Sequence, residues 1–205
     1  MPTRIYLNDV YPYDIPDFKG DEKNIINFDI KNKEDQFWTK QPLPNFEKLT
    51  QKQLMDWIWK EEERRRNGVH FLNNGELTYI NPIHYKFLQY YTGDFSTKTD
   101  KKKRSPDFWD AHRLYCYFLE FSENYEYAVG DITFKPRRRG ITQIHNSNAI
   151  ENVIGNFSCH AGLMSANKKM VKESQFYPIR NCISKYQQFF RPKFKTNGGK
   201  MLDGK

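Results

Sequence analysis

The segment 132–154 places the strongest constraint on how this chain can fold. It begins with a short apolar run, continues through the basic turn Lys-Pro-Arg-Arg-Arg-Gly, and ends in a stretch of helical character. A strand, a tight turn and a helix in this order are typical of a phosphate-cradling loop, because the free N–H groups at a helix N-terminus attract anions. Gly140 and Thr142 match the common pattern G-x-x-x-x-G-K-[ST]. Ile141 stands where that pattern has its lysine, and Lys135 stands where it has its first glycine.

Another basic side chain must therefore replace the missing lysine. Lys135 lies five residues before Gly140, and its long side chain is the first candidate to reach the β- and γ-phosphates of a nucleotide. The hydroxyl of Thr142 is the candidate ligand for Mg²⁺. Guanidinium groups pair bidentately with phosphate oxygens, so three further candidates are Arg137, Arg138 and Arg139. The alternative interpretation is a basic turn that contacts nucleic-acid backbone or solvent.

The composition favours a folded, basic protein. The 205 residues are 38% apolar, include 16 Phe and 13 Tyr, and carry a net charge of +8. A basic balance suggests an anionic partner such as nucleic acid or a nucleotide. The three cysteines (Cys116, Cys159 and Cys182) have no disulfide-framework or zinc-site spacing, which favours a reducing cytosol. The sequence also has no apolar run of about 20 residues and no signal-peptide pattern at its start, so we expect neither a membrane nor a secreted protein.

Helix- and strand-breaking residues and changes in the residue pattern divide the chain into four regions. Residues 1–49 predict an extended arm that is broken by prolines and pinned to a surface by Phe37, Trp38 and Phe46. Residues 50–127 predict a helical and hairpin region. Residues 128–190 predict the phosphate-loop core, and residues 191–205 a tail or truncated end.

Local signals define the elements of region 50–127. Thr50 and Gln53 form a capping box that starts a helix, which Gly68 ends. Asn74-Gly75 predicts a hairpin turn between two short β-prone runs. Asn81 caps a helix with Pro82 at its first position, and Ser105-Pro106 starts another that reaches about Asn124.

Region 128–190 alternates strand and helix. A strand leads into the basic turn, the following helix ends at Gly155, and residues 159–165 predict a second, buried strand. Asn167 then caps a helix that Pro178 divides from another reaching about Phe189. This order predicts an α/β fold with a right-handed βαβ unit and parallel strands.

The order of these blocks resembles the N-terminal part of tailed-phage terminase large subunits, in particular those of crAss-like and related phages. In the loop, the residues that match are Lys135, Arg138, Gly140 and Thr142. Outside the loop, the likeness is carried by residues 59–71 and 73–80, His84-Tyr85-Lys86-Phe87-Leu88 and Pro106-Asp107-Phe108-x-Asp110. The resemblance covers about residues 50–190.

The resemblance implies an incomplete P-loop NTPase core of the RecA-like, additional-strand type. It implies that ATP and Mg²⁺ bind through a variant Walker A loop and power the translocation of double-stranded phage DNA into the capsid. The implied partners are the portal protein, the small terminase subunit and further copies of the chain. The implied location is the host cytoplasm, at the procapsid portal.

The carboxylates that would complete such a motor are missing from the sequence. Residues 166–205 contain only Glu173 and Asp203 as acids, and neither follows an apolar strand as a Walker B motif requires. No catalytic residue is therefore assigned, and we expect the isolated chain to turn over ATP poorly. This pattern suggests a fragment or a truncated or split product.

Other basic and aromatic positions are weaker candidates. A run of four basic residues is expected either to form a solvated loop or to contact the DNA backbone: Lys101, Lys102, Lys103 and Arg104. His84 and His112 are expected to have structural roles, and His145 is expected to face solvent or to pack. The resemblance would place the adenine-binding residues in segment 106–113. Two other functions remain open: a non-catalytic nucleic-acid-binding or virion-associated protein, and another P-loop enzyme such as a helicase.

Overall fold

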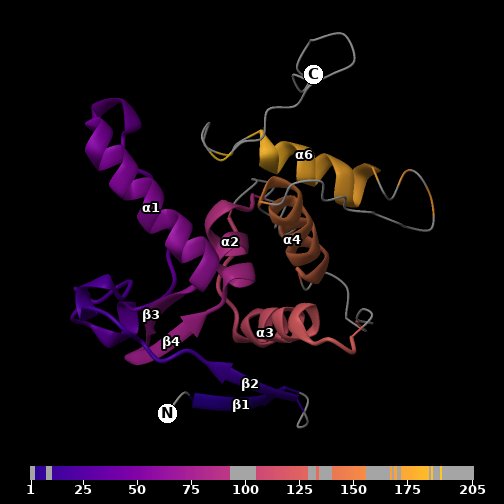
Figure 1. Cartoon of the computed structure of the whole chain (residues 1–205), viewed down its shortest axis with the longest axis horizontal. Helices are drawn as coiled ribbons and strands as arrows, with labels where there is room; N and C mark the ends of the chain where they lie inside the picture. Colours follow the sequence, from indigo (N-terminus) through magenta and orange to yellow (C-terminus); the bar gives the residue numbers. More distant parts are fainter. Residues whose placement is uncertain are drawn as a thin grey trace. The chain divides into compact units, whose positions relative to one another are not determined.

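The computed structural model describes residues 3–7, 11–92, 105–128, 133, 140–155, 167, 169, 172–184, 186 and 190. The chain divides into two compact units. Unit 1 comprises Met1–Gln89 and Asp107–Pro136, and unit 2 comprises Tyr90–Pro106 and Arg137–Lys205. Figure 1 labels the helices and strands.

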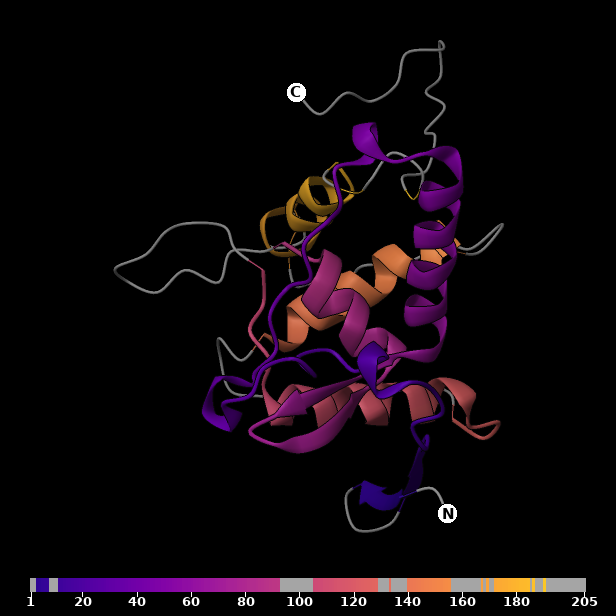
Figure 2. The ribbon, with the colours of Figure 1, turned by 90° about the vertical axis from the view of Figure 1, so that its left-hand side faces the viewer.

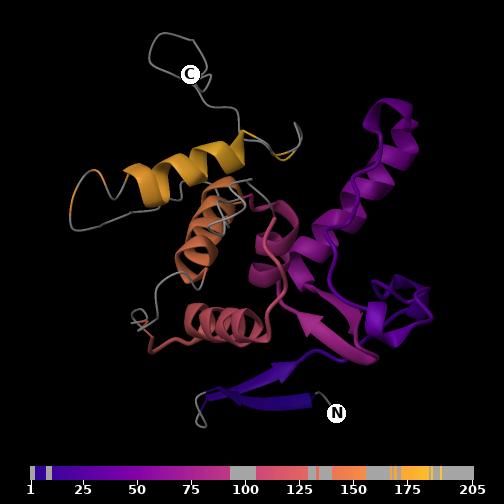
Figure 3. The same cartoon turned by 180° about the vertical axis from the view of Figure 1, so that it is seen from behind.

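A two-stranded hairpin opens unit 1. Strands β1 (Thr3–Leu7) and β2 (Tyr11–Ile15) are antiparallel, with Ile5 opposite Tyr13. One side of this hairpin packs on helix α3 (Asp110–Asn124), as Figures 1 and 3 show. The resulting hydrophobic cluster consists of Leu7, Tyr79 and Tyr117, with Ile5, Tyr13, Ile15, Phe118 and Phe121 packed against them. The sequence predicted only an extended arm here, because the alternation is short and is interrupted by a proline.

The rest of the arm contains three short 3₁₀ helices: η1 (Glu22–Asn24), η2 (Lys33–Asp35) and η3 (Phe46–Lys48). An Asp or Asn side chain caps each of them by accepting a backbone N–H two residues further on.

Two of the three predicted aromatic anchors hold this arm. Trp38 is buried and lies edge-on to Phe71, with ring centroids 5.7 Å apart, and Phe46 lies 5.0 Å from Trp57. The prediction for Phe37 is wrong, because its side chain is 54% exposed.

Helix α1 (Gln51–Asn67) begins with the predicted capping box, since Thr50 and Gln53 exchange hydrogen bonds. Gly68, at a φ of 71°, turns the chain from this helix into strand β3 (Val69–Asn73). Strand β3 pairs antiparallel with β4 (Glu76–Ile80), and the turn between them has positive φ at both Asn74 and Gly75. Positive φ at both central positions is the signature of a type I′ hairpin turn, so the predicted hairpin is confirmed. Figure 2 shows this hairpin beside α3.

The next two helices differ in how well the sequence predicted them. Helix α2 (Pro82–Tyr90) has the predicted cap, because Oδ1 of Asn81 accepts the N–H of His84 at 3.0 Å. Helix α3 begins at Asp110 rather than at Ser105-Pro106, since Trp109 is still extended. In the extended segment before α3, Phe108 packs its ring against Phe71, with centroids 5.0 Å apart.

Within the described residues, unit 2 contains helix α4 (Ile141–Gly155), the π turn η4 (Lys172–Phe176) and helix α6 (Tyr177–Ile183). Helix α4 spans the residues predicted for the helix after the basic turn. Phe176 has helical dihedrals, so η4 runs directly into α6 and Pro178 does not divide the helix as predicted. A proline lacks an N–H and its ring crowds the carbonyl four residues earlier, and the wider π turn accommodates both effects.

The predicted parallel βαβ core is wrong. Within the described residues the strands form two isolated antiparallel hairpins, accompanied by five α-helices, and the one parallel pairing is a single bridge between Ile26 and Phe71. Of the strand predicted before the basic turn, Thr133 is described and is not in a strand; its hydroxyl hydrogen-bonds that of Tyr115 at 2.9 Å. The second predicted strand, 159–165, lies outside the described residues. The reason for the error is that a short apolar run has no periodicity that separates a buried strand from other structure.

Candidate phosphate-binding site at the start of α4

Gly140 sets the geometry at the start of α4. Its φ is 77°, a conformation that glycine adopts without steric cost. Its carbonyl accepts the N–H groups of Gln143, at 2.8 Å, and Ile144, at 3.1 Å. The N–H groups of Ile141 and Thr142 precede these bonds and have no acceptor within the helix. The start of this 15-residue helix therefore presents donors and a partial positive charge, which suit an anion.

Thr142, the predicted Mg²⁺ ligand, lies in the first turn of α4. Its side chain is half-buried. The described residues also contain no group of three or more His, Cys, Asp or Glu side chains that could hold a metal ion. Among the described residues, a magnesium ion bound here would therefore take the Thr142 hydroxyl together with water and phosphate oxygens.

Three of the predicted phosphate-site residues are described, namely Gly140, Ile141 and Thr142, and all three are half-buried. Ile141 carries no charge and can offer a phosphate only its backbone N–H. The four basic candidates lie outside the described residues; they are Lys135, Arg137, Arg138 and Arg139. The weaker DNA-contact candidates also lie outside them: Lys101, Lys102, Lys103 and Arg104.

Two tyrosine hydroxyls donate hydrogen bonds to polar side chains of α4. The sequence did not predict either bond. The hydroxyl of Tyr91 donates to Oε1 of Gln143, in the turn next to Thr142. The hydroxyl of Tyr186 donates to Oε1 of Glu151, two turns further along the helix. Burial raises the pKa of the Tyr91 phenol, so this group keeps the proton that it donates. The spacing of Gln143 and Glu151 could have indicated a polar face on this helix, because residues eight positions apart lie on the same side of an α-helix.

The buried face of α4 is more polar than that of an ordinary core helix. Its buried residues are Ile144, Asn146, Ser147, Ile150 and Glu151. Elsewhere in unit 2, an aromatic residue that precedes α4 in the sequence packs against two that follow it. The ring of Tyr90 stacks on Tyr186, with centroids 5.3 Å apart, and lies 6.2 Å from Phe190. The buried thiol of Cys182 on α6 donates to the carbonyl of Tyr90 at 3.6 Å.

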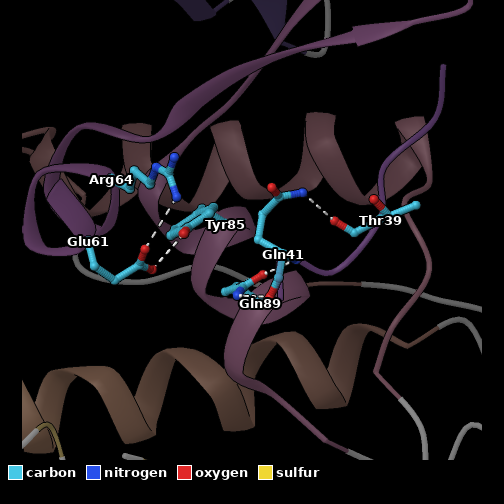
Figure 4. Close-up of polar contacts among 6 residues, drawn as sticks. All are labelled: Thr39, Gln41, Glu61, Arg64, Tyr85 and Gln89. Atoms are coloured by element: carbon cyan, nitrogen blue, oxygen red, sulfur yellow. Dashed lines mark hydrogen bonds and ion pairs between the residues drawn. The ribbon is translucent and has the colours of Figure 1, made fainter. Parts of the chain in front are cut away.

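A second polar cluster, in unit 1, fixes α2 against α1 and the arm (Figure 4). The hydroxyl of Tyr85 donates to Oε1 of Glu61 at 2.6 Å, and Nη1 of Arg64 lies 3.5 Å from Oε2 of the same carboxylate. Gln41 and Gln89 exchange two hydrogen bonds of 2.9 Å between backbone and side-chain groups. These contacts join neighbouring elements of unit 1 and show no feature of a ligand site.

The histidines and the segment expected near adenine are packed in unit 1. His84 is fully buried and stacks on Phe108, with centroids 5.4 Å apart, and His112 is buried and stacks on Trp109 at 5.1 Å. Their burial fits the structural role predicted for them. Arg113 pairs with Asp110 at 2.9 Å. Segment 106–113 thus contains the buried His112, the half-buried Phe108, the exposed Trp109 and a local ion pair, and it identifies no adenine contact.

Comparisons with known protein families, with curated proteins and with solved structures each found no match. The described part of the chain also contains no helix that is both long and apolar enough to cross a membrane.

Proposed function

We propose that this chain binds ATP and Mg²⁺ at the start of α4, as the N-terminal ATP-binding portion of a tailed-phage DNA-packaging motor. One observation carries the proposal: Gly140, with its positive φ, opens a 15-residue helix directly after the string Lys-Pro-Arg-Arg-Arg. A helix start and an adjacent basic string supply the two things that phosphate binding requires, namely oriented N–H donors and positive side chains. The resemblance to terminase large subunits supports ATP as the phosphate-bearing ligand.

Each residue has a defined role in this proposal. The backbone N–H groups of Ile141 and Thr142 bind phosphate oxygens, and the hydroxyl of Thr142 ligates Mg²⁺. Lys135 and Arg138 neutralise the phosphate charge. Phosphoryl transfer depends on positioning and charge neutralisation, and hydrolysis also needs a group that orients the attacking water. Since no such carboxylate was recognised, we expect nucleotide binding without efficient turnover. Double-stranded DNA, the portal protein, the small terminase subunit and further copies of this chain are its proposed partners.

A second candidate function is non-catalytic binding of nucleic acid through the same basic string. The observation that favours it is the absence of a parallel sheet among the described strands, because ATPases of the resembled family are built on such a sheet. Phosphate contacts of this kind are insensitive to sequence and weaken steeply with salt.

One calorimetric experiment separates the two candidates. The chain is titrated with a non-hydrolysable ATP analogue, with and without Mg²⁺, and separately with a mixed-sequence DNA duplex at low and at moderate salt. The proposal expects saturable, Mg²⁺-dependent binding of the analogue, which Thr142→Val weakens when Mg²⁺ is present. Salt-sensitive duplex binding without any analogue binding would overturn the nucleotide proposal in favour of the second candidate.

A further inference from the structure

A continuous row of four aromatic rings in unit 1 runs from strand β2, over the C-terminal end of helix α3, to the turn that follows this helix. Tyr11 of β2 and Phe121 of α3 have ring centroids 5.1 Å apart. Phe121 stacks on Tyr125 at 5.2 Å and 21°, and Tyr125 meets Tyr127 at 5.6 Å and 69°. We call these four residues the aromatic row. The last two rings stand nearly perpendicular to each other and form a corner.

Three rings of the aromatic row are exposed, including Tyr11 at 40%, and the fourth ring, Phe121, anchors the row. Tyr127 is 75% exposed and Tyr125 is 43% exposed, while Phe121 packs against the hydrophobic cluster of unit 1. The N–H of Ala128 donates to the carbonyl of Tyr125 at 2.9 Å, which closes the turn that carries Tyr127. The row is therefore pre-formed, and a partner would bind it with little loss of conformational entropy.

The segment that carries three of the four rings is acidic in sequence, whereas the whole chain is basic. Residues 114–128 contain three glutamates and no lysine or arginine, although the net charge of the chain is +8. Glu120 is occupied internally, since its carboxylate accepts hydrogen bonds from Tyr13 and Asn81. Glu126 is exposed, and it lies between Tyr125 and Tyr127 in the sequence of the turn. This turn thus carries two exposed tyrosines and an exposed glutamate on three consecutive residues.

We propose that the aromatic row, together with Glu126, is a docking surface for an arginine-rich segment of a protein partner. A guanidinium group is planar, stacks on aromatic faces and pairs with a carboxylate through two hydrogen bonds, so an arginine-rich segment suits a turn that carries exposed tyrosines and an exposed glutamate. A lysine can use only the charge. Nucleic acid could stack on the rings, but its phosphates would be repelled by the glutamates.

The test uses the full chain and a short peptide with three consecutive arginines, with the matching tri-lysine peptide as the comparison. Binding is measured by calorimetry at low salt. We expect the arginine peptide to bind more tightly than the lysine peptide, and Tyr127→Ala and Glu126→Gln each to weaken it. One exposed cation–π contact corresponds to a change of about two- to five-fold in affinity. The matched controls, Trp59→Ala and Glu63→Gln, alter exposed residues of α1 and should leave the affinity unchanged.

Two results would overturn the proposal. The first is equal affinity for the arginine and lysine peptides, or arginine-peptide binding that Tyr127→Ala leaves intact. The second is binding of a single-stranded oligothymidylate that Tyr127→Ala abolishes, because this would assign the row to nucleic acid. Tyr127 and Glu126 are both exposed, so neither substitution is expected to disturb the fold, and circular dichroism of the variants checks this.

Discussion

The hydroxyl of Tyr85, on α2, donates a 2.6 Å hydrogen bond to Oε1 of Glu61, on α1, and both side chains are buried. The Glu61 carboxylate is only 3% exposed, so water cannot replace a lost donor. The two residues are 24 positions apart in the sequence, and they tie the long first helix to the second.

Removing the Tyr85 hydroxyl should therefore destabilise the protein. We expect Tyr85→Phe to lower the free energy of unfolding by about 1.5–3 kcal/mol, the usual range for a hydrogen bond to a charged group. Urea denaturation measures this change. The control is Tyr6→Phe, at a residue that is 61% exposed, and it should change stability by less than about 0.5 kcal/mol. Equal stabilities of the two variants would show that the Tyr85–Glu61 bond does not hold α1.

Gly68→Ala should destabilise the turn between α1 and β3. The φ of Gly68 is 71°, and a Cβ built there would lie 2.3 Å from the carbonyl oxygen of Ile80. We expect a loss of more than about 1 kcal/mol of unfolding free energy. Gly20→Ala is the matched control, because its φ is not positive and its nearest neighbour, an atom of Phe18, is 3.6 Å away. A Gly68→Ala variant as stable as wild type would contradict this view of the turn.

The buried His84 should make unit 1 sensitive to acid. Burial lowers the pKa of His84 well below its ordinary value, and the charges of His112 and Arg113 lower it further. Below a pH of about 6.5 the unfolded chain gains a proton on this histidine that the folded chain does not. Stability should therefore fall as the pH drops below about 6.5, by up to about 1.4 kcal/mol per pH unit for this group.

The variant His84→Leu should show a smaller loss of stability over the same pH range. Unfolding free energies at several pH values between 7.5 and 5 give the comparison. Burial also lowers the pKa of His70, so the dependence should decrease rather than disappear. An identical pH dependence in wild type and variant would show that His84 does not remain neutral in the fold.

Ser147→Ala should leave unit 2 as stable as before, or more stable. The side-chain oxygen of Ser147 on α4 is buried and has no hydrogen-bond partner among the described residues. Burying an unsatisfied hydroxyl costs free energy, and alanine removes that cost while favouring the helix. Tyr186→Phe, which removes the donor to Glu151, should have the opposite effect. Thermal unfolding measures both, and a clear loss of stability in Ser147→Ala would indicate a hydrogen-bond partner for its hydroxyl.

The sequence predicted local structure well where cap and turn chemistry is explicit. The Thr50–Gln53 capping box, the Asn74-Gly75 turn and the Asn81 cap all lie where they were expected. Each of these signals depends on residues within three positions of one another, so neighbouring side chains are enough to define it.

Features that depend on distant residues were missed or predicted wrongly. The hairpin β1–β2 is stabilised by packing on α3, about one hundred residues later, which no local pattern reveals. The contact of Tyr186 with Glu151 spans 35 residues. The parallel core was inferred from short apolar runs, and these do not identify a strand without knowledge of its partner. At the candidate site, the sequence predicted that Gly140 and Thr142 lie at the start of a helix, but it did not predict the tyrosines that contact this helix.

The most direct test of the proposed function is the affinity of a non-hydrolysable ATP analogue, with Mg²⁺, for wild type, Lys135→Ala and Ile141→Ala. We expect Lys135→Ala to abolish detectable binding, because Lys135 supplies the charge that the common pattern places at position 141. We expect Ile141→Ala to have little effect, since this position contributes only its backbone N–H. Equal affinity of wild type and Lys135→Ala in calorimetry would show that Lys135 does not bind the nucleotide phosphates.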